Sequence, residues 1–200
     1  LQDLRGTAHD SLLIRDLLSH QSGLASWIPF YKEMIDTVSG MPFAASVSCV
    51  KTEIFSQRVA NHLYIRPSRI DTIYKRIIQS GISQKGKYVY SDLGFIYLGR
   101  LVEKVTGRSI NQYVKEHFYD PMSLHRLGYL PQQRVPLNNI IPTEHEKKFR
   151  CQLLRGDVHD PAAALMGGVA GHAGLFGTAY EVAVIMQMLV NGGKIGRAHV

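Results

Sequence analysis

The chain of 200 residues has no long apolar run. No stretch approaches the roughly 18 apolar residues that a membrane-spanning helix requires, so no membrane span is expected within it. The opening residues, LQDLRGTAHDS, carry acidic side chains and no apolar stretch, so they lack the pattern of a signal peptide. No internal repeat and no low-complexity linker divides the chain, and its length suits one domain or a large part of one.

Cysteine is scarce, and the spacings typical of metal sites are missing. Cys49 and Cys151 are the two cysteines, and they pair only if the fold brings them together. His159, Asp160 and His172 suggest metal ligands by type, but no H-x-x-x-H, C-x-x-C or H-E-x-x-H spacing accompanies them. The sequence therefore predicts neither a metal nor an organic cofactor.

Basic residues outnumber acidic ones, 23 to 16, which gives a formal charge of +7. Such a balance can indicate a nucleic-acid partner. The basic residues are scattered, however, and the densest group is only Lys147, Lys148 and Arg150. Without a basic stripe that alternates with aromatic residues, no nucleic-acid partner is predicted.

Helical patterns are the main structural signal. Expected helices follow N-terminal capping boxes at Ser68 with Asp71, Ser109 with Gln112, and Thr178 with Glu181. Two further helices are expected, one near 12–19 and one that spans 93–105 and stops at Thr106-Gly107, and glycines at 23, 81, 107 and 192–193 close the helical segments. On the last helix we expect Val182, Ile185, Met186 and Leu189 to form the buried face.

Strand patterns are few. Residues 127–141 are rich in Pro, Gln and Asn and are expected to be irregular. The segment NNIIPTE (138–144) is a weak strand candidate, and three or more strands are not expected from this chain.

Tyr90 stands at the start of the expected helix that carries Leu93 to Val105, with Ser91 or Asp92 as the N-cap of that helix. A phenol at the positive end of a helix dipole is biased toward tyrosinate, the form that acts as a general base. Tyrosine before a capped helix is also common for structural reasons, so these three residues leave both interpretations open.

Three segments together carry a specific resemblance. LLSHQSGL (17–24), YVYSDLGFIYLGRLVEKVTG (88–107) and GGVAGHAGLFGTAYEVAVIMQMLVNGG (167–193) occur in this order. The chain resembles the serine β-lactamase-related hydrolases, which include class C β-lactamases, penicillin-binding proteins, esterases and D-aminopeptidases. The resemblance implies an α/β fold of the β-lactamase/transpeptidase type. In that fold an antiparallel sheet is flanked by helices and carries an inserted helical subdomain, and this chain contributes mostly helices.

The resemblance also implies where the domain lies. We expect residues 1–194 to form part of such a hydrolase domain. Residues 195–200 (IGRAHV) match what a common sequencing adapter encodes, so they are expected not to be natural sequence. Some members that share VHDPAAALMGGVAGHAGLF follow a glycoside hydrolase domain, which makes an upstream fusion possible. Members that act on the cell wall are exported, which implies a periplasmic or secreted protein.

Family members use a Ser-x-x-Lys pair, a Tyr-x-Asn motif and a Lys-Thr-Gly-like triplet to transfer an acyl group to serine. By resemblance, Tyr90 is the tyrosine of the second motif. Asp92 stands where Asn is more usual, and an ionised Asp can accept hydrogen bonds but cannot donate one. Asp92 could instead pair with the lysine of the first motif.

The only Ser-x-x-Lys in the chain begins at Ser48 and ends at Lys51. It follows LLSHQSGL, whereas the nucleophile helix of the family precedes that segment, and it lies only 90 − 48 = 42 residues before Tyr90. We therefore expect Ser48 and Lys51 to be surface residues and the nucleophile to lie upstream of Leu1. The chain by itself is then expected to be inactive.

The intact protein is expected to hydrolyse an ester, a β-lactam or a D-amino-acid peptide, with a small-molecule or peptidoglycan-derived substrate. The alternative is a non-catalytic module that binds glycan or peptidoglycan on a degenerate hydrolase fold.

His172 leaves several interpretations open. His172-Ala173-Gly174 superficially matches a Lys-Thr-Gly-type triplet, but a capped helix follows it at once. A place on the rim of the active site, with Gly171 and His172 as substrate-binding residues, is one expectation; a structural histidine within a glycine-rich loop is another. His20 and Ser22 follow a helix C-terminus and are assigned no chemistry.

Overall fold

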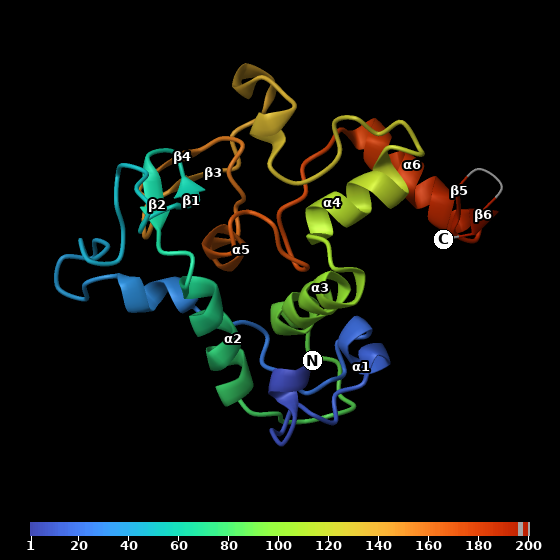
Figure 1. The fold of residues 1–200 in the computed structure, drawn as a ribbon, viewed down its shortest axis with the longest axis horizontal. Coiled ribbons are helices and arrows are strands. Elements are labelled where there is room, and N and C mark those ends of the chain that lie inside the picture. Colours follow the sequence, from blue (N-terminus) through green and yellow to red (C-terminus); the bar gives the residue numbers. More distant parts are fainter. Residues whose placement is uncertain (196–197, 200) are drawn as a thin grey trace.

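The computed structural model describes residues 1–195 and 198–199 (Figure 1). Helices dominate its regular structure, and short 3-10 turns at Gln2–Leu4, Phe30–Met34, Pro131–Gln133 and Leu137–Asn139 connect them. One π-helical turn, Lys115–Tyr119, extends the fourth helix. The α-helices are α1 (Ile14–Leu18), α2 (Arg69–Gln79), α3 (Asp92–Thr106), α4 (Ile110–Val114), α5 (Pro161–Leu165) and α6 (Ala179–Val190).

The strands pair as antiparallel hairpins, and no sheet among the described residues has more than two strands. The pairs are β1 (Gln57–Ala60) with β2 (Leu63–Ile65), β3 (Glu144–Glu146) with β4 (Gln152–Leu154), and β5 (Lys194–Ile195) with β6 (Ala198–His199). The expectation of fewer than three strands is therefore wrong. Strands this short show no alternating pattern, and the candidate at 138–144 contributes only its last residue to β3, because residues 137–139 form a 3-10 turn.

Capping chemistry was predicted better than strands. The boxes at Ser109 with Gln112 and at Thr178 with Glu181 are both formed. The box at Ser68 is not formed, because Ser68 is already in the right-handed helical conformation, from which its side chain makes no capping hydrogen bond. Gly107 ends α3 with a φ of 70°, as expected for a left-handed C-terminal glycine.

The main core joins α2 and α3 to the β1–β2 hairpin and α5, which lie close together in the fold (Figure 1). Ile77 of α2 and Ile65 of β2 are fully buried, and Tyr97 of α3 is only 2% exposed. A second, smaller cluster forms around Tyr119, next to α6. This core fixes the N-terminal end of α3, where the predicted motif lies.

The buried face of α6 differs from the prediction. Met186 and Leu189 are 52% and 57% exposed, whereas Met188 and Glu181 are buried. Apolar residues occupy most positions of this helix, so their spacing could not identify the packed side.

Candidate functional site

The Tyr90-Ser91-Asp92 segment is fixed by its backbone against residues 20–26. The Ser91 N–H donates to Nδ1 of His20 at 3.0 Å, and the Asp92 N–H donates to the carbonyl of Ser26 at 2.8 Å. The Ser91 hydroxyl donates to the carbonyl of Ala25 at 2.7 Å. Ser91 thus occupies the predicted N-cap position of α3, but its side chain makes a tertiary contact instead of a capping bond. The start of α3 is held in place by a segment far away in the sequence.

Tyr90 projects from this fixed segment. Its side chain is 61% exposed, and its phenol makes no hydrogen bond to any described residue. Its ring lies beside the imidazole of His20, with 4.6 Å between the ring centroids, and Phe95 lies near the same imidazole at 5.1 Å. The backbone and the ring of Tyr90 are therefore positioned while its side chain remains exposed.

His20 is a residue of this site that the sequence interpretation missed. It follows α1 with a φ of 57°, and its imidazole accepts from Ser91 at Nδ1, which requires an unprotonated Nδ1. The LLSHQSGL segment (17–24), which contains His20, was recognised as a family signal, but no local pattern linked His20 to Tyr90. Gly23 shares the segment, and a Cβ there would lie 2.3 Å from the carbonyl of Ser83.

Asp92 lies with Asp160 on the wall of a small pocket, about 30 Å³ in volume, which Trp27 and Ile28 also line. Burial raises the pKa of the Asp92 carboxyl; nearby His172 and His20 oppose this shift, and Asp160 adds to it. The structure therefore brings Asp92 close to the histidine loop predicted for the site.

His172 pairs with Asp160. Its Nε2 lies 2.8 Å from Oδ1 of Asp160, and its side chain is only 3% exposed. Asp160 also caps α5 by accepting from the Ala163 N–H at 2.7 Å. Burial raises the pKa of Asp160, but the hydrogen bonds from His172 and Ala163 outweigh it, so the net shift is downward. Nδ1 of His172 is buried without a partner among the described atoms.

Gly171 allows the histidine loop to contact α3 closely. A Cβ at Gly171 would lie 2.0 Å from the carbonyl of Phe95 and 3.0 Å from Cα of Gly99. Only glycine permits this backbone approach. In the structure Gly171 thus packs against α3 and fixes the position of the neighbouring His172, while a direct role in substrate binding stays a prediction.

Ser48 and Lys51 do not form a helical nucleophile pair. Residues 48–51 lie outside the helices, and the Ser48 hydroxyl donates to the carbonyl of Val50 at 2.7 Å. Lys51 is exposed. The expectation of a surface position thus holds for Lys51, while Ser48 is half-buried.

Cysteine and metal chemistry have no assembled site in the described part of the chain. Cys49 and Cys151 are both free and exposed. No group of three or more His, Cys, Asp or Glu residues is placed to hold a metal ion within the described ranges. His159 pairs with Glu144 at 3.1 Å instead. Across residues 1–195 and 198–199, no helix is long and apolar enough to span a bilayer.

A stability prediction follows from the raised pKa of Asp92. The pKa of Asp92 is higher in the folded state than its unfolded value of 3.8. Its contribution to stability is therefore fully present at pH values below 3.8 and is lost as the pH rises through the folded-state pKa, because the buried carboxyl then becomes charged. We expect Asp92→Asn to be more stable than the wild type at neutral pH, with the difference shrinking toward acid. Urea unfolding between about pH 4 and pH 8 measures this difference.

Asp71→Asn is the matched control, because Asp71 also lies in the first turn of a helix but is exposed. Loss of the Asp71 carboxylate should lower the free energy of unfolding slightly at neutral pH, since a negative charge stabilises a helix N-terminus. A neutral-pH loss of stability in Asp92→Asn as well would contradict the assigned burial effect.

The comparisons with known proteins identify the family of this chain. The family model described as Beta-lactamase matches residues 1–200. An N-acetylmuramyl-L-alanine amidase of Bacillus subtilis (strain 168) is 32% identical over 197 residues, which are 92% of this chain and 39% of that protein. An Escherichia coli (strain K12) protein, named for a proposed D-alanyl-D-alanine carboxypeptidase activity, is 40% identical over 122 residues, 55% of this chain and 28% of that protein.

A solved structure supports the fold. The octameric penicillin-binding protein homologue from Pyrococcus abyssi superposes with a TM-score of 0.53 at 17% identity, covering 92% of this chain and 35% of the other. This chain thus spans less than half the length of each of these relatives. The expected β-lactamase/transpeptidase-like fold is confirmed, and the chain belongs to the Beta-lactamase family.

Proposed function

We propose that this chain is the tyrosine-bearing part of a serine hydrolase that cleaves an amide bond in a peptidoglycan-derived, D-amino-acid-containing substrate. The observation that carries the proposal is the exposed phenol of Tyr90 on a backbone fixed by His20, Ala25 and Ser26. Catalysis requires a proton-transfer group held in position yet open to substrate. The names of the two curated relatives favour an amide over an ester or a β-lactam.

In the proposed reaction, a serine outside residues 1–200 attacks the amide carbonyl. The serine oxygen–carbon bond forms, the carbon–nitrogen bond breaks, and the serine proton passes through Tyr90 and a lysine to the leaving amine. Water then attacks the acyl-enzyme; its proton returns to the serine by the same groups, and the acid product leaves. Tyr90 thus serves both steps.

Asp92 is proposed to orient the substrate or the lysine. Where an asparagine amide would donate to a substrate carbonyl, the carboxylate of Asp92 accepts from an N–H or an ammonium group. Its place beside Asp160 and near His172 supports a role for these residues at the rim. An upstream glycoside hydrolase domain stays a prediction.

The second candidate is a non-catalytic binding module for glycan or peptidoglycan. The departure at Asp92 from the more usual asparagine favours it. The sequence that precedes Leu1 in the gene discriminates: an intact Ser-x-x-Lys supports the hydrolase, and a degraded one supports the binding module.

Residues 1–200 alone are expected to hydrolyse neither p-nitrophenyl acetate nor N-acetyl-D-alanyl-D-alanine above the buffer rate, because Tyr90 without a serine cannot form an acyl-enzyme. The protein extended by its preceding sequence should cleave the peptide. Ser48→Ala, the control variant, should not change the rate of either form. Hydrolysis by residues 1–200 that disappears in Ser48→Ala would overturn the proposed division of the site.

A further inference from the structure

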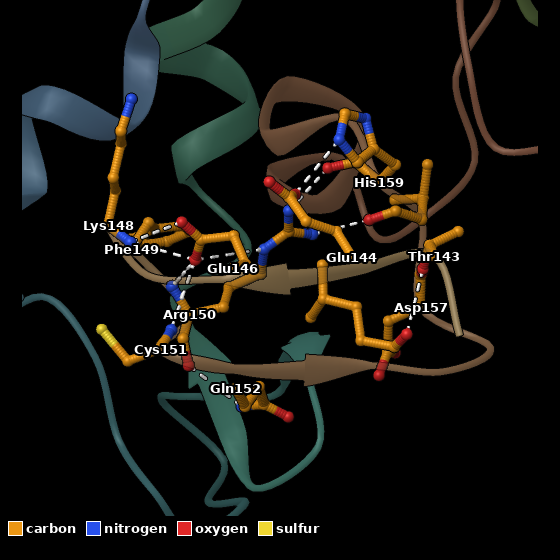
Figure 2. A network of polar contacts seen from close by, with 12 residues as sticks. Thr143, Glu144, Glu146, Lys148, Phe149, Arg150, Cys151, Gln152, Asp157 and His159 are labelled. Atoms are coloured by element: carbon orange, nitrogen blue, oxygen red, sulfur yellow. Dashed lines mark hydrogen bonds and ion pairs between the residues drawn. The ribbon is translucent and has the colours of Figure 1, made fainter.

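A large cavity in the described structure lies apart from Tyr90. It has a volume of about 750 Å³ and lies between the β1–β2 and β3–β4 hairpins and the segment 131–137. Sites for small organic ligands typically have volumes of about 300–1,000 Å³. Gln152 and Asp157, at the β4 side of this cavity, are seen in Figure 2.

Part of the polar lining builds the wall itself. Arg58 forms two hydrogen bonds to Asp157, at 3.1 and 2.9 Å, and Gln132 donates to the same carboxylate at 3.1 Å. The guanidinium of Arg134 donates to the backbone carbonyls of Gly128 and Tyr129. These groups already have hydrogen-bond partners and form part of the cavity wall.

Other polar side chains of the lining have no partner. Arg155 is half-buried, yet its guanidinium makes no hydrogen bond or ion pair with any described residue. The side-chain amides of Asn61 and Gln133 are also unpaired within the described ranges. Three arginines face one carboxylate, which leaves a charge of 3 − 1 = +2 in the cavity. A half-buried, unpaired guanidinium beside free amides suits a ligand with a carboxylate and several hydroxyl or acetamido groups.

The cavity continues toward the histidine loop. A second cavity, about 230 Å³ in volume, shares Arg58, Gln132, Gln133 and Asp157 with the first and extends to Gly167 and Gly168. Gly168 lies four residues before His172. The large cavity therefore adjoins a second one that reaches the glycines preceding His172.

We propose that this cavity binds a carboxylated amino sugar, N-acetylmuramic acid, whose lactyl carboxylate becomes free when the amide between a muramyl group and its peptide is cleaved. This inference rests on the proposed function for the identity of the sugar. Arg155 pairs with the carboxylate, while Asn61 and Gln133 bind hydroxyl and acetamido groups. Leu137 and Leu153, which are 50% and 54% exposed and line the same cavity, cover a face of the sugar ring.

N-acetylmuramic acid and N-acetylglucosamine form the matched probe pair, because they differ by the lactyl ether that carries the carboxylate. Titration of the isotope-labelled chain, followed by amide shifts in NMR spectra, should give saturable changes at Asn61, Gln133 and Arg155 with N-acetylmuramic acid. We expect a dissociation constant on the order of 1 mM. N-acetylglucosamine should bind about tenfold more weakly, because it lacks the charge-assisted hydrogen bond.

Arg155→Gln should weaken N-acetylmuramic acid binding about tenfold. Gln133→Ala provides a second variant, at an exposed side chain that forms no hydrogen bond with the described residues. Arg5→Gln, at an exposed arginine outside the cavity, should leave binding unchanged. The proposal would be overturned if the two sugars bound equally well or if no saturable shift appeared. It would also be overturned if N-acetyl-D-alanyl-D-alanine competed for the cavity as well as N-acetylmuramic acid binds it.

Failure of the cavity proposal and failure of the hydrolase proposal are distinguishable. Binding of the free sugar requires no bond cleavage, so saturable binding in a protein without amidase activity would overturn only the hydrolase proposal. If the wild-type protein showed no saturable sugar binding and Arg155→Gln kept the wild-type amidase activity, only the cavity proposal would be overturned.

Discussion

Tyr90→Phe, made in the protein that includes the preceding sequence, is expected to lower kcat by about 10²- to 10⁴-fold on a muramyl peptide. The change removes only the hydroxyl, which makes no hydrogen bond to the described residues. The ring contact with His20 and the backbone bond from Ser91 are retained. The fold should therefore remain intact, and steady-state kinetics with the thermal midpoint as a reference would measure the effect.

Tyr88→Phe is the matched control. Tyr88 is 68% exposed and also contacts His20, edge to face at 5.8 Å, so it shares the surroundings of Tyr90 but precedes the motif by two residues. Its kcat should stay within about twofold of the wild type, as for surface changes away from the reacting groups. Equal losses in both variants would contradict a specific role for the Tyr90 phenol.

Arg150→Ala should lower the free energy of unfolding by about 3–5 kcal/mol, because it leaves two carbonyl groups without their donors at a cost of about 1–3 kcal/mol each. The Arg150 side chain is 0% exposed, and its guanidinium donates to the carbonyls of Val158 and His159 at 2.6 Å each (Figure 2). Glu146, whose Oε2 lies 3.9 Å from Nε of Arg150, would keep its charge. Truncation removes the bonds that tie β3–β4 to the segment leading to Asp160. Urea unfolding measures the loss.

Glu146 remains partly satisfied in that variant. Burial raises the pKa of Glu146, but backbone N–H groups of the turn, including those of Lys148, Phe149 and Cys151, outweigh it, so its pKa is lowered. Lys148→Ala is the control: its exposed side chain should contribute less than about 0.5 kcal/mol. A loss in Arg150→Ala no larger than this would show that the buried guanidinium does not stabilise the fold.

The helices were predictable because their signals are local. The capping boxes at Ser109 and Thr178 and the C-terminal Gly107 each depend on residues within one turn. The hairpins were not, because strands such as Gln152–Leu154 are too short to show a period of two. Arg150 was noted only as part of a basic group, since its burial depends on carbonyls eight and nine residues away.

The site was predictable only in part. Tyr90 and Asp92 followed from the motif, and His172 from the glycine-rich loop, but the partners of these residues did not. His20 contacts Ser91 across 71 residues, and Asp160 meets His172 across 12. Such pairings depend on how α1, α3 and α5 pack, which no local pattern encodes. Gly196, Arg197 and Val200 of the suspected adapter segment lie outside the described residues.

The central claim is that Tyr90 serves an acyl transfer to serine. Mass spectrometry of the protein with its preceding sequence, after rapid acid quench with a slowly hydrolysed D-alanyl ester, tests it most directly. We predict a single acyl adduct on a serine upstream of Leu1, formed much more slowly in Tyr90→Phe. An adduct on Ser48, or turnover of the ester without any serine adduct, would contradict the claim.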